Sequence, residues 1–215
     1  MKKRIGFTLS EVLITLGVIG VVAAMTLPTL IKNYQKTVTV TRLKATYSTI
    51  SQAVKMSEVD NGAITTWKFP NPDSSYSIKK LYTDTYFKPY FKNIKECKKL
   101  SDCVSENYYR MNGELDSETI DKPTLMLNNG VVLAFNFDSE SNMCIVITDI
   151  NGKRGPNTAG KDKFWIVLDL VTGYIQFDGQ QNNLYQIKKD CKLLGYYCGA
   201  WIFMNGWKIP DDYPW

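Results

Sequence analysis

The hydrophobic pattern of the chain opens with an apolar run over residues 7–31 that holds one charged residue, Glu11. As a helix, these 25 residues would extend over about 37 Å at about 1.5 Å per residue. The hydrocarbon core of a bilayer is about 30 Å thick, so the run can cross it with some tilt. Pro28 lies inside the run, removes one helical hydrogen bond and is expected to kink the helix. The pattern therefore predicts a transmembrane helix, interrupted at Pro28.

A second pattern indicates that the helix continues beyond the membrane. Apolar side chains recur at offsets of 0, 4, 7 and 11 residues, at Leu43, Tyr47, Ile50 and Val54. This spacing is one face of a helix with about 3.6 residues per turn. Asp60-Asn61-Gly62 supplies the stop, because glycine readily adopts the left-handed conformation that ends a helix. We expect a helix over residues 7–62 with one face turned toward a globular head over residues 63–215.

The first part of the head is aromatic-rich and predicts short helices. Residues 78–99 carry eight large apolar side chains and are broken by Pro89, which suggests one or two short helices on the head. Large rings with this spacing are more often core residues than ligand contacts. We therefore assign no binding role to this stretch.

Strands are predicted from residue 124 onward. Residues 124–127 and 131–137 flank Asn128-Asn129-Gly130, which is a hairpin turn. Two β-branched runs follow at residues 144–148 and 164–170, and Thr172-Gly173 then turns the chain into residues 174–177. The sequence predicts an α+β fold, in which the long amino-terminal helix packs on a carboxy-terminal antiparallel β-sheet.

The charges before the apolar run orient it in the membrane. Lys2, Lys3 and Arg4 place the amino terminus on the cytoplasmic side by the positive-inside rule. Removing these three residues would lower the formal net charge from +5 to +2, because they account for three of the 26 basic residues. The remaining lysines and arginines are scattered, so the composition implies no nucleic-acid partner.

The junction between the basic segment and the apolar run carries a family resemblance. Glu11 lies five positions after Gly6 in the segment KKRIGFTLSE. This segment resembles the class III leader of type IV pilins and type II secretion pseudopilins. The resemblance implies that residues 1–6 are a leader, which a prepilin peptidase removes by cutting between Gly6 and Phe7. It also implies that the new amino-terminal Phe7 is N-methylated.

The same resemblance gives assembly roles to Glu11 and Pro28. A carboxylate within a membrane helix costs about 2.5–3.5 kcal/mol on insertion scales, so it needs a partner. In pilins, a glutamate at this place neutralises the freed amine of a neighbouring subunit in the filament core, and a kink is common at the depth of Pro28. Three alternatives remain, namely a cleaved secretory signal, a plain signal-anchor, and a Glu11 that reaches water at the membrane interface.

Five cysteines and no histidine limit the chemistry of the head. Without histidine, Ser-His and Cys-His catalysis and histidine-ligated metals are excluded. Cys191 and Cys198 enclose a short loop, as do Cys97 and Cys103, so both pairs are disulfide candidates. Cys144 lies in an apolar strand and is left over as a free thiol. Four cysteines allow three pairings, and a zinc site built from them is a further alternative that the spacing does not support.

One loop resembles a calcium site. Asp149 and Asn151 begin an Asp-x-Asn-Gly segment, Asp162 follows eleven residues after Asn151, and major pseudopilins carry calcium in their heads. Lys153 and Arg154 stand where a calcium loop requires neutral or acidic oxygen ligands. The alternative is an Asx-turn scaffold without metal.

Together these features predict a non-enzymatic structural subunit of a type IV pilus or a type II secretion pseudopilus. Its expected partners are the prepilin peptidase, the assembly machinery of the inner membrane and other pilin subunits. Its expected location is the inner membrane, single-pass with an extracytoplasmic head, and then a surface or periplasmic filament. The alternative is a membrane-anchored extracytoplasmic binding domain that does not polymerise.

Overall fold

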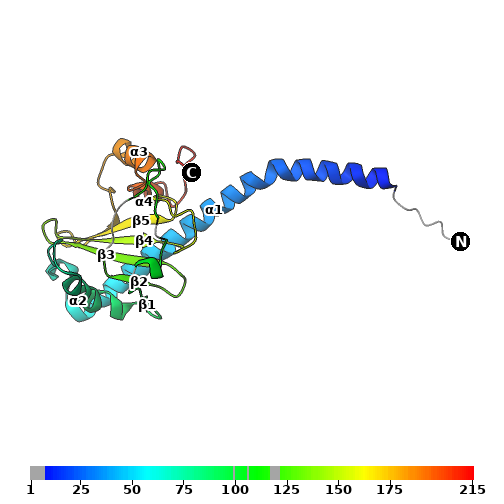
Figure 1. The fold of residues 1–215 in the computed structure, drawn as a ribbon. Coiled ribbons are helices and arrows are strands. Elements are labelled where there is room, and N and C mark those ends of the chain that lie inside the picture. The colour runs from blue at the N-terminus through cyan, green and yellow to red at the C-terminus, as the bar shows by residue number, and fades with distance from the viewer. Residues whose placement is uncertain (1–7, 99, 106, 117–121) are drawn as a thin grey trace. The chain divides into compact units, whose positions relative to one another are not determined.

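A computed structural model describes residues 8–98, 100–105, 107–116 and 122–215 of the chain (Figure 1). The chain divides into two compact units, Met1–Val38 and Thr39–Trp215. Helix α1 (Leu9–Asn61) contributes to both units. The division falls inside this helix, and not at its end, because the second half of α1 buries side chains in the core of the head.

In the first unit, α1 is helical from Leu9 onward and continues through Pro28. The secondary structure is therefore not interrupted at Pro28, and the expected kink stays a prediction. A proline removes one backbone hydrogen bond, and the remaining bonds on either side of Pro28 maintain the helix. The apolar side chains of this unit are exposed, with Leu13 at 62% and Ile14 at 64% relative accessibility.

In the second unit, α1 presents the predicted apolar face to the head. Leu43, Ile50 and Val54 are almost completely buried in the main core. Tyr47 is half-buried, its ring stacks on Phe177 with centroids 5.2 Å apart, and its hydroxyl donates a hydrogen bond to a backbone carbonyl of the sheet. The helix ends at Asn61, and Gly62 follows with a φ of +79°, as the sequence predicted.

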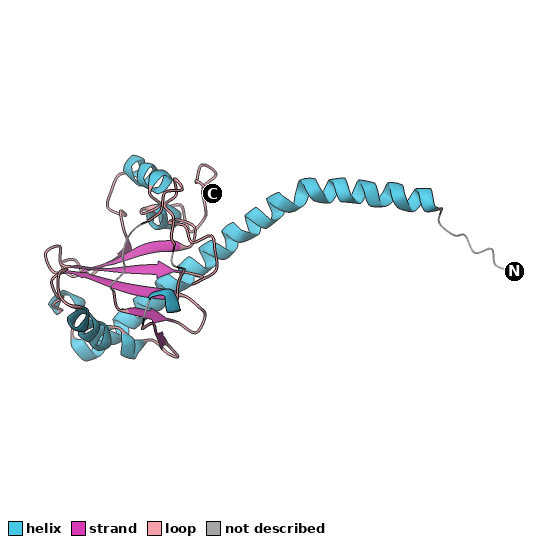
Figure 2. Ribbon diagram, in the orientation of Figure 1, coloured by secondary structure: helices cyan, strands magenta, loops and turns pink. Residues whose placement is uncertain are grey.

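The head is built on one antiparallel sheet in which strand order follows chain order, β1-β2-β3-β4-β5-β6. The strands are β1 (Lys95–Glu96), β2 (Thr124–Met126), β3 (Val132–Asp138), β4 (Met143–Asp149), β5 (Lys163–Asp169) and β6 (Ile175–Phe177). Figure 2 shows the strands side by side with helices outside the sheet. The predicted α+β fold is confirmed. The pattern missed β1, because two residues are too few to show alternation.

The register of the central strands separates two buried faces. Phe135, Val146 and Ile166 are cross-strand neighbours and belong to the main core that includes α1. Ala134, Ile147 and Trp165 are neighbours on the opposite face and form a smaller cluster. Because side chains alternate along a strand, burial on both faces explains why these strands are nearly continuous apolar runs.

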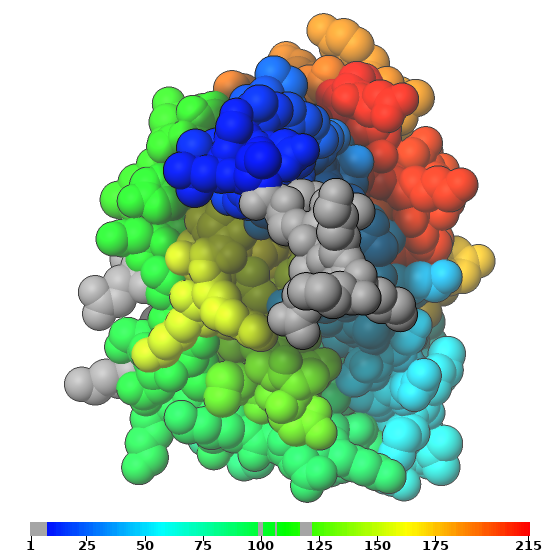
Figure 3. Space-filling model, turned by 90° about the vertical axis from the view of Figure 1, so that its right-hand side faces the viewer, coloured from blue at the N-terminus to red at the C-terminus, as the bar shows by residue number. Residues whose placement is uncertain are grey.

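Short helices cover the rest of the head. They are η1 (Ile64–Thr66), α2 (Tyr76–Tyr86), η2 (Lys88–Tyr90), η3 (Leu100–Asp102), α3 (Leu184–Leu193) and α4 (Cys198–Met204). Phe87, between α2 and η2, is fully buried, and its ring centroid is 4.7 Å from that of Phe135. The aromatic stretch therefore contributes side chains to the core, as expected. The carboxy-terminal segment lies beside α3 (Figure 3), where Lys188 and Lys192 pair with Asp212 at 3.0 and 3.7 Å.

Candidate functional site

The amino-terminal helix carries the residues to which the resemblance assigns processing and assembly. Gly6 and Phe7 lie outside the residues that the structure describes. Among the described helices, α1 is the one that is long and apolar enough to cross a membrane, and none of its apolar window is buried within the protein. Pro28 lies within this helix and is exposed.

Glu11 makes a capping box with Thr8, the residue before the helix. Its Oε2 atom accepts hydrogen bonds from the Thr8 backbone N–H and hydroxyl, both at 2.8 Å. The Glu11 N–H donates back to Oγ1 of Thr8 at 3.3 Å. A Thr-x-x-Glu spacing at a helix start satisfies amide groups that otherwise have no partner. The Thr-x-x-Glu spacing in the sequence is the local signal for this capping role, which is separate from a contact between subunits.

Two disulfides close short loops of the head. Cys97 bonds to Cys103, and Cys191 bonds to Cys198. Cys144 is a buried free cysteine, and burial raises the pKa of its thiol well above the usual value. No cluster of metal-binding side chains is present in the described part of the chain. The two disulfides are the pairings that the sequence favoured.

We expect loss of the Cys191–Cys198 bond to destabilise the head and loosen its carboxy terminus. The loop is short, so its closure contributes about 2–3 kcal/mol by limiting the unfolded chain. The double variant Cys191→Ser/Cys198→Ser should show a lower melting temperature and faster proteolysis after α3. The matched control, Cys97→Ser/Cys103→Ser, opens a loop of similar length and should leave the carboxy terminus resistant. Recovery of Cys191 and Cys198 as alkylatable thiols in the folded native protein would contradict the pairing.

The loop between β4 and β5 is held by its two aspartates. Oδ1 of Asp149 accepts backbone hydrogen bonds from Asn151 at 2.9 Å and Gly152 at 2.6 Å, and the hydroxyl of Tyr108 donates to Oδ2. The carboxylate of Asp162 accepts backbone N–H groups of the same loop, both at 2.6 Å. The Asn151 side-chain amide also donates to Asp162, at 3.3 Å. These contacts are those of an Asx-turn scaffold.

The calcium assignment to Asp149, Asn151 and Asp162 stays a prediction. A calcium ion would have to replace hydrogen bonds that both carboxylates already accept. The Oδ1 atoms of Asn151 and Asn157 are buried without a hydrogen-bond donor among the described residues, and amide oxygens are possible calcium ligands. A rise in melting temperature on addition of calcium chloride, absent from Asp162→Asn, would establish the site.

The environment of Asp149 predicts a pH-dependent stability. Burial raises the pKa of Asp149 to about 7, far above that of an exposed aspartate. The folded state therefore holds this proton more tightly than the unfolded state. The resulting stabilisation is fully present below about pH 4 and is lost progressively until about pH 7.

We therefore expect the wild-type protein to lose stability relative to Asp149→Asn as the pH rises through this window. Melting temperatures of both proteins, measured in the same buffers, give the difference. Asp211→Asn, at an exposed position, is the matched control and should follow the wild type. Parallel curves for wild type and Asp149→Asn would show that Asp149 titrates normally.

Lys163 is a buried charge without a signal in the local sequence pattern. Its Nζ atom is 2.7 Å from Oδ2 of Asp116, and both side chains are at most 2% exposed. The same Nζ lies 4.9 Å from the ring centroid of Tyr108 and 5.0 Å from that of Trp165. Lys163 begins β5, where a lysine usually reaches solvent, so only the fold reveals the pair.

Comparison with known proteins divides the chain near residue 28. Residues 1–27 match the prokaryotic N-terminal methylation motif, and residues 29–215 match a family of unknown function, DUF6613. No curated protein and no solved structure gives a match. The methylation motif marks a class III prepilin leader, implies processing by a prepilin peptidase and is typical of structural proteins. The chain belongs to the DUF6613 family and is a pilin-like precursor with a class III prepilin leader.

Proposed function

We propose that this protein is a structural subunit of a type IV pilus or a type II secretion pseudopilus. The observation that carries the proposal is the methylation motif at residues 1–27, which continues directly into α1 with its exposed apolar side chains. Assembly through this helix would cover the apolar surface, first with lipid and then with the helices of neighbouring subunits. The head would then form the outside of the filament.

The capping box supports a specific assembly step at Glu11. In the single chain, the helix start supplies hydrogen bonds to the Glu11 carboxylate, which makes its presence in an apolar segment less costly. Cleavage after Gly6 would create a new amine at Phe7. In a filament, the amine of one subunit would pair with Glu11 of its neighbour, so that two charges share one desolvated site.

The two disulfides support an extracytoplasmic head. Disulfides persist in oxidising compartments and are rare in the cytoplasm. With the basic leader on the cytoplasmic side, a single crossing of α1 would place the head on the opposite side. The proposed location is therefore the inner membrane, with the head outside the cytoplasm, before incorporation into a filament.

Mass spectrometry of the protein from its native host tests the processing step. We expect the mature chain to begin at Phe7 with one added methyl group on its amine. Gly6→Val should block cutting, because a peptidase site that accepts glycine has little room for a branched side chain, whereas Ile5→Val should not. An intact Met1 in a host with an active prepilin peptidase, or a mature start near Met25, would contradict the proposal.

Electron microscopy of sheared surface material distinguishes the filament from the alternative of a membrane-anchored binding domain. A filament subunit should be found in the sheared filaments by peptide mass spectrometry. A binding domain that does not polymerise would remain entirely in the membrane fraction, even when its amino terminus is cleaved and methylated.

A further inference from the structure

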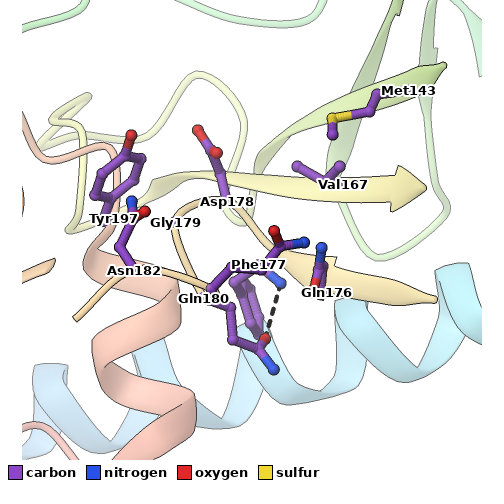
Figure 4. Close-up of a pocket in the computed structure, with 10 residues that line it drawn as sticks. Met143, Val167, Gln176, Phe177, Asp178, Gly179, Gln180, Asn182 and Tyr197 are labelled. Atoms are coloured by element: carbon purple, nitrogen blue, oxygen red, sulfur yellow. Dashed lines mark hydrogen bonds between the residues drawn. The ribbon is translucent and has the colours of Figure 1, made fainter. Parts of the chain in front are cut away.

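The loop between β6 and α3 forms one wall of a polar cavity in the head (Figure 4). The cavity is open to solvent and has a volume of about 210 Å³, which suits a small molecule or a single side chain. Its polar lining consists of one carboxylate, one phenol and four side-chain amides, from Asp178, Tyr197, Gln176, Gln180, Gln181 and Asn182. Met143 and Val167 supply an apolar wall from the neighbouring strands.

The cavity is built by close packing between this loop and the start of α4. Gly179 has a φ of +79°, and a Cβ atom at this position would collide with the Tyr197 ring. Tyr197 directly precedes Cys198, which is bonded to Cys191 in α3. The glycine and the disulfide therefore fix the place of the ring. Gln180 closes the loop, because its Oε1 atom accepts the Phe177 backbone N–H at 3.1 Å.

Asp178 lies in this cavity without a cationic partner. In Figure 4, it lies between Tyr197 on one side and Val167 and Met143 on the other. None of the lining residues is basic, and no lysine or arginine in the described part of the chain forms a salt bridge with Asp178. Burial raises the pKa of the Asp178 carboxyl, which a backbone N–H of Gly179 only partly offsets. A partly buried carboxylate of this kind gains from a cation.

The other groups of the cavity match the requirements of an ammonium ion. The hydroxyl of Tyr197, which lines the same cavity, can accept a hydrogen bond from an ammonium N–H. Burial raises the pKa of Tyr197, and the negative charges of Asp178 and Asp190 raise it further. An ammonium group has three N–H donors, and the amide oxygens of the loop can accept those that the carboxylate does not. A neutral ligand would leave the Asp178 charge uncompensated.

We propose that this cavity binds a small molecule through a primary ammonium group, which pairs with the carboxylate of Asp178 beside the ring of Tyr197. This site is independent of α1 and goes beyond the assembly function. Through this site, the head of the subunit would bind a small molecule from the surrounding medium. The ligand class is a short-chain primary amine, whose few carbon atoms around the charged group match the volume of the cavity.

Isothermal titration calorimetry on the full-length chain in a nonionic detergent tests the site with n-butylammonium chloride. We expect saturable binding with a dissociation constant on the order of 1 mM or lower. Butan-1-ol has the same chain without the charge and should not bind. Asp178→Asn should raise the dissociation constant about tenfold or more, whereas Asp211→Asn makes the same change at an exposed position and should not.

A second variant keeps the test decisive if Asp178→Asn does not fold. Asn182 is exposed and lines the cavity, so Asn182→Lys would add a competing ammonium group and should abolish butylammonium binding. Thr85→Lys, on the exposed side of α2, is the matched control and should bind as the wild type does. Unchanged binding by Asn182→Lys would overturn the proposal. Absence of butylammonium binding, or saturation by the neutral sugar glucose in its place, would overturn it as well.

Discussion

Replacing Lys163 with methionine is expected to lower the free energy of unfolding by about 3–5 kcal/mol. Lys163 and Asp116 are paired at 2.7 Å, and neither side chain reaches solvent appreciably. Methionine preserves most of the volume of the lysine stem, so the loss arises from the charge that remains. Breaking a buried pair by removing one partner leaves the other charge desolvated, and the nearest remaining cation, Nε of Arg110, is 4.0 Å from Oδ1 of Asp116 on a partly exposed side chain. Denaturant unfolding of the wild type and the variant in the same detergent measures the difference.

Two further variants distinguish the effect of the unpaired buried charge on stability from the effect of losing any lysine. Lys188→Met breaks a pair with Asp212 at the surface, where such pairs contribute about 0–1 kcal/mol, so it should change little. The double variant Lys163→Met/Asp116→Leu removes both buried charges and should recover part of the lost stability. A Lys163→Met protein within about 1 kcal/mol of the wild type would show that the pair is not buried in solution.

Local periodicity was sufficient to predict the main elements of the fold. The spacing of Leu43, Ile50 and Val54 identified the buried face of α1, and Gly62 identified its end. The Asn-Gly turn and the apolar runs located β2 to β6 within a few residues. These features depend on neighbours in the sequence, which is why pattern alone could find them.

The features of the fold that have no local signal in the sequence depend on contacts between distant segments. Lys163 meets Asp116 across 47 positions of the chain, and no pattern within β5 signals a buried charge. β1 exists because Lys95 and Glu96 pair with β2, which begins almost thirty residues later. The cavity at Asp178, which follows β6, also requires Tyr197, which lies directly before α4. Tertiary packing determines such features, so a single sequence without its fold gives no local signal for them.

The capping box was a different kind of omission, and it affects how an experiment on Glu11 should be designed. Thr8 and Glu11 lie three residues apart, so their contact has a local signal in the sequence. An apolar substitution of Glu11 removes the side-chain half of this capping box as well as a proposed contact between subunits. Loss of a cap alone costs about 1 kcal/mol. The two contributions must be separated before an assembly role can be assigned.

Glu11→Val is expected to leave membrane insertion and cleavage intact but to reduce incorporation into filaments by roughly a hundredfold or more. An unpaired amine in the filament core would cost about 3–5 kcal/mol, and each 1.4 kcal/mol is about a factor of ten in association. Glu11→Leu should behave in the same way, and Glu11→Asp should be intermediate. Thr8→Ala is the control, because it weakens the cap and keeps the carboxylate, so it should incorporate nearly as well as the wild type. Quantitative mass spectrometry of sheared filaments against the membrane fraction measures incorporation. Normal filament yield from Glu11→Val, with its membrane level unchanged, would show that the carboxylate is not an assembly contact in this protein.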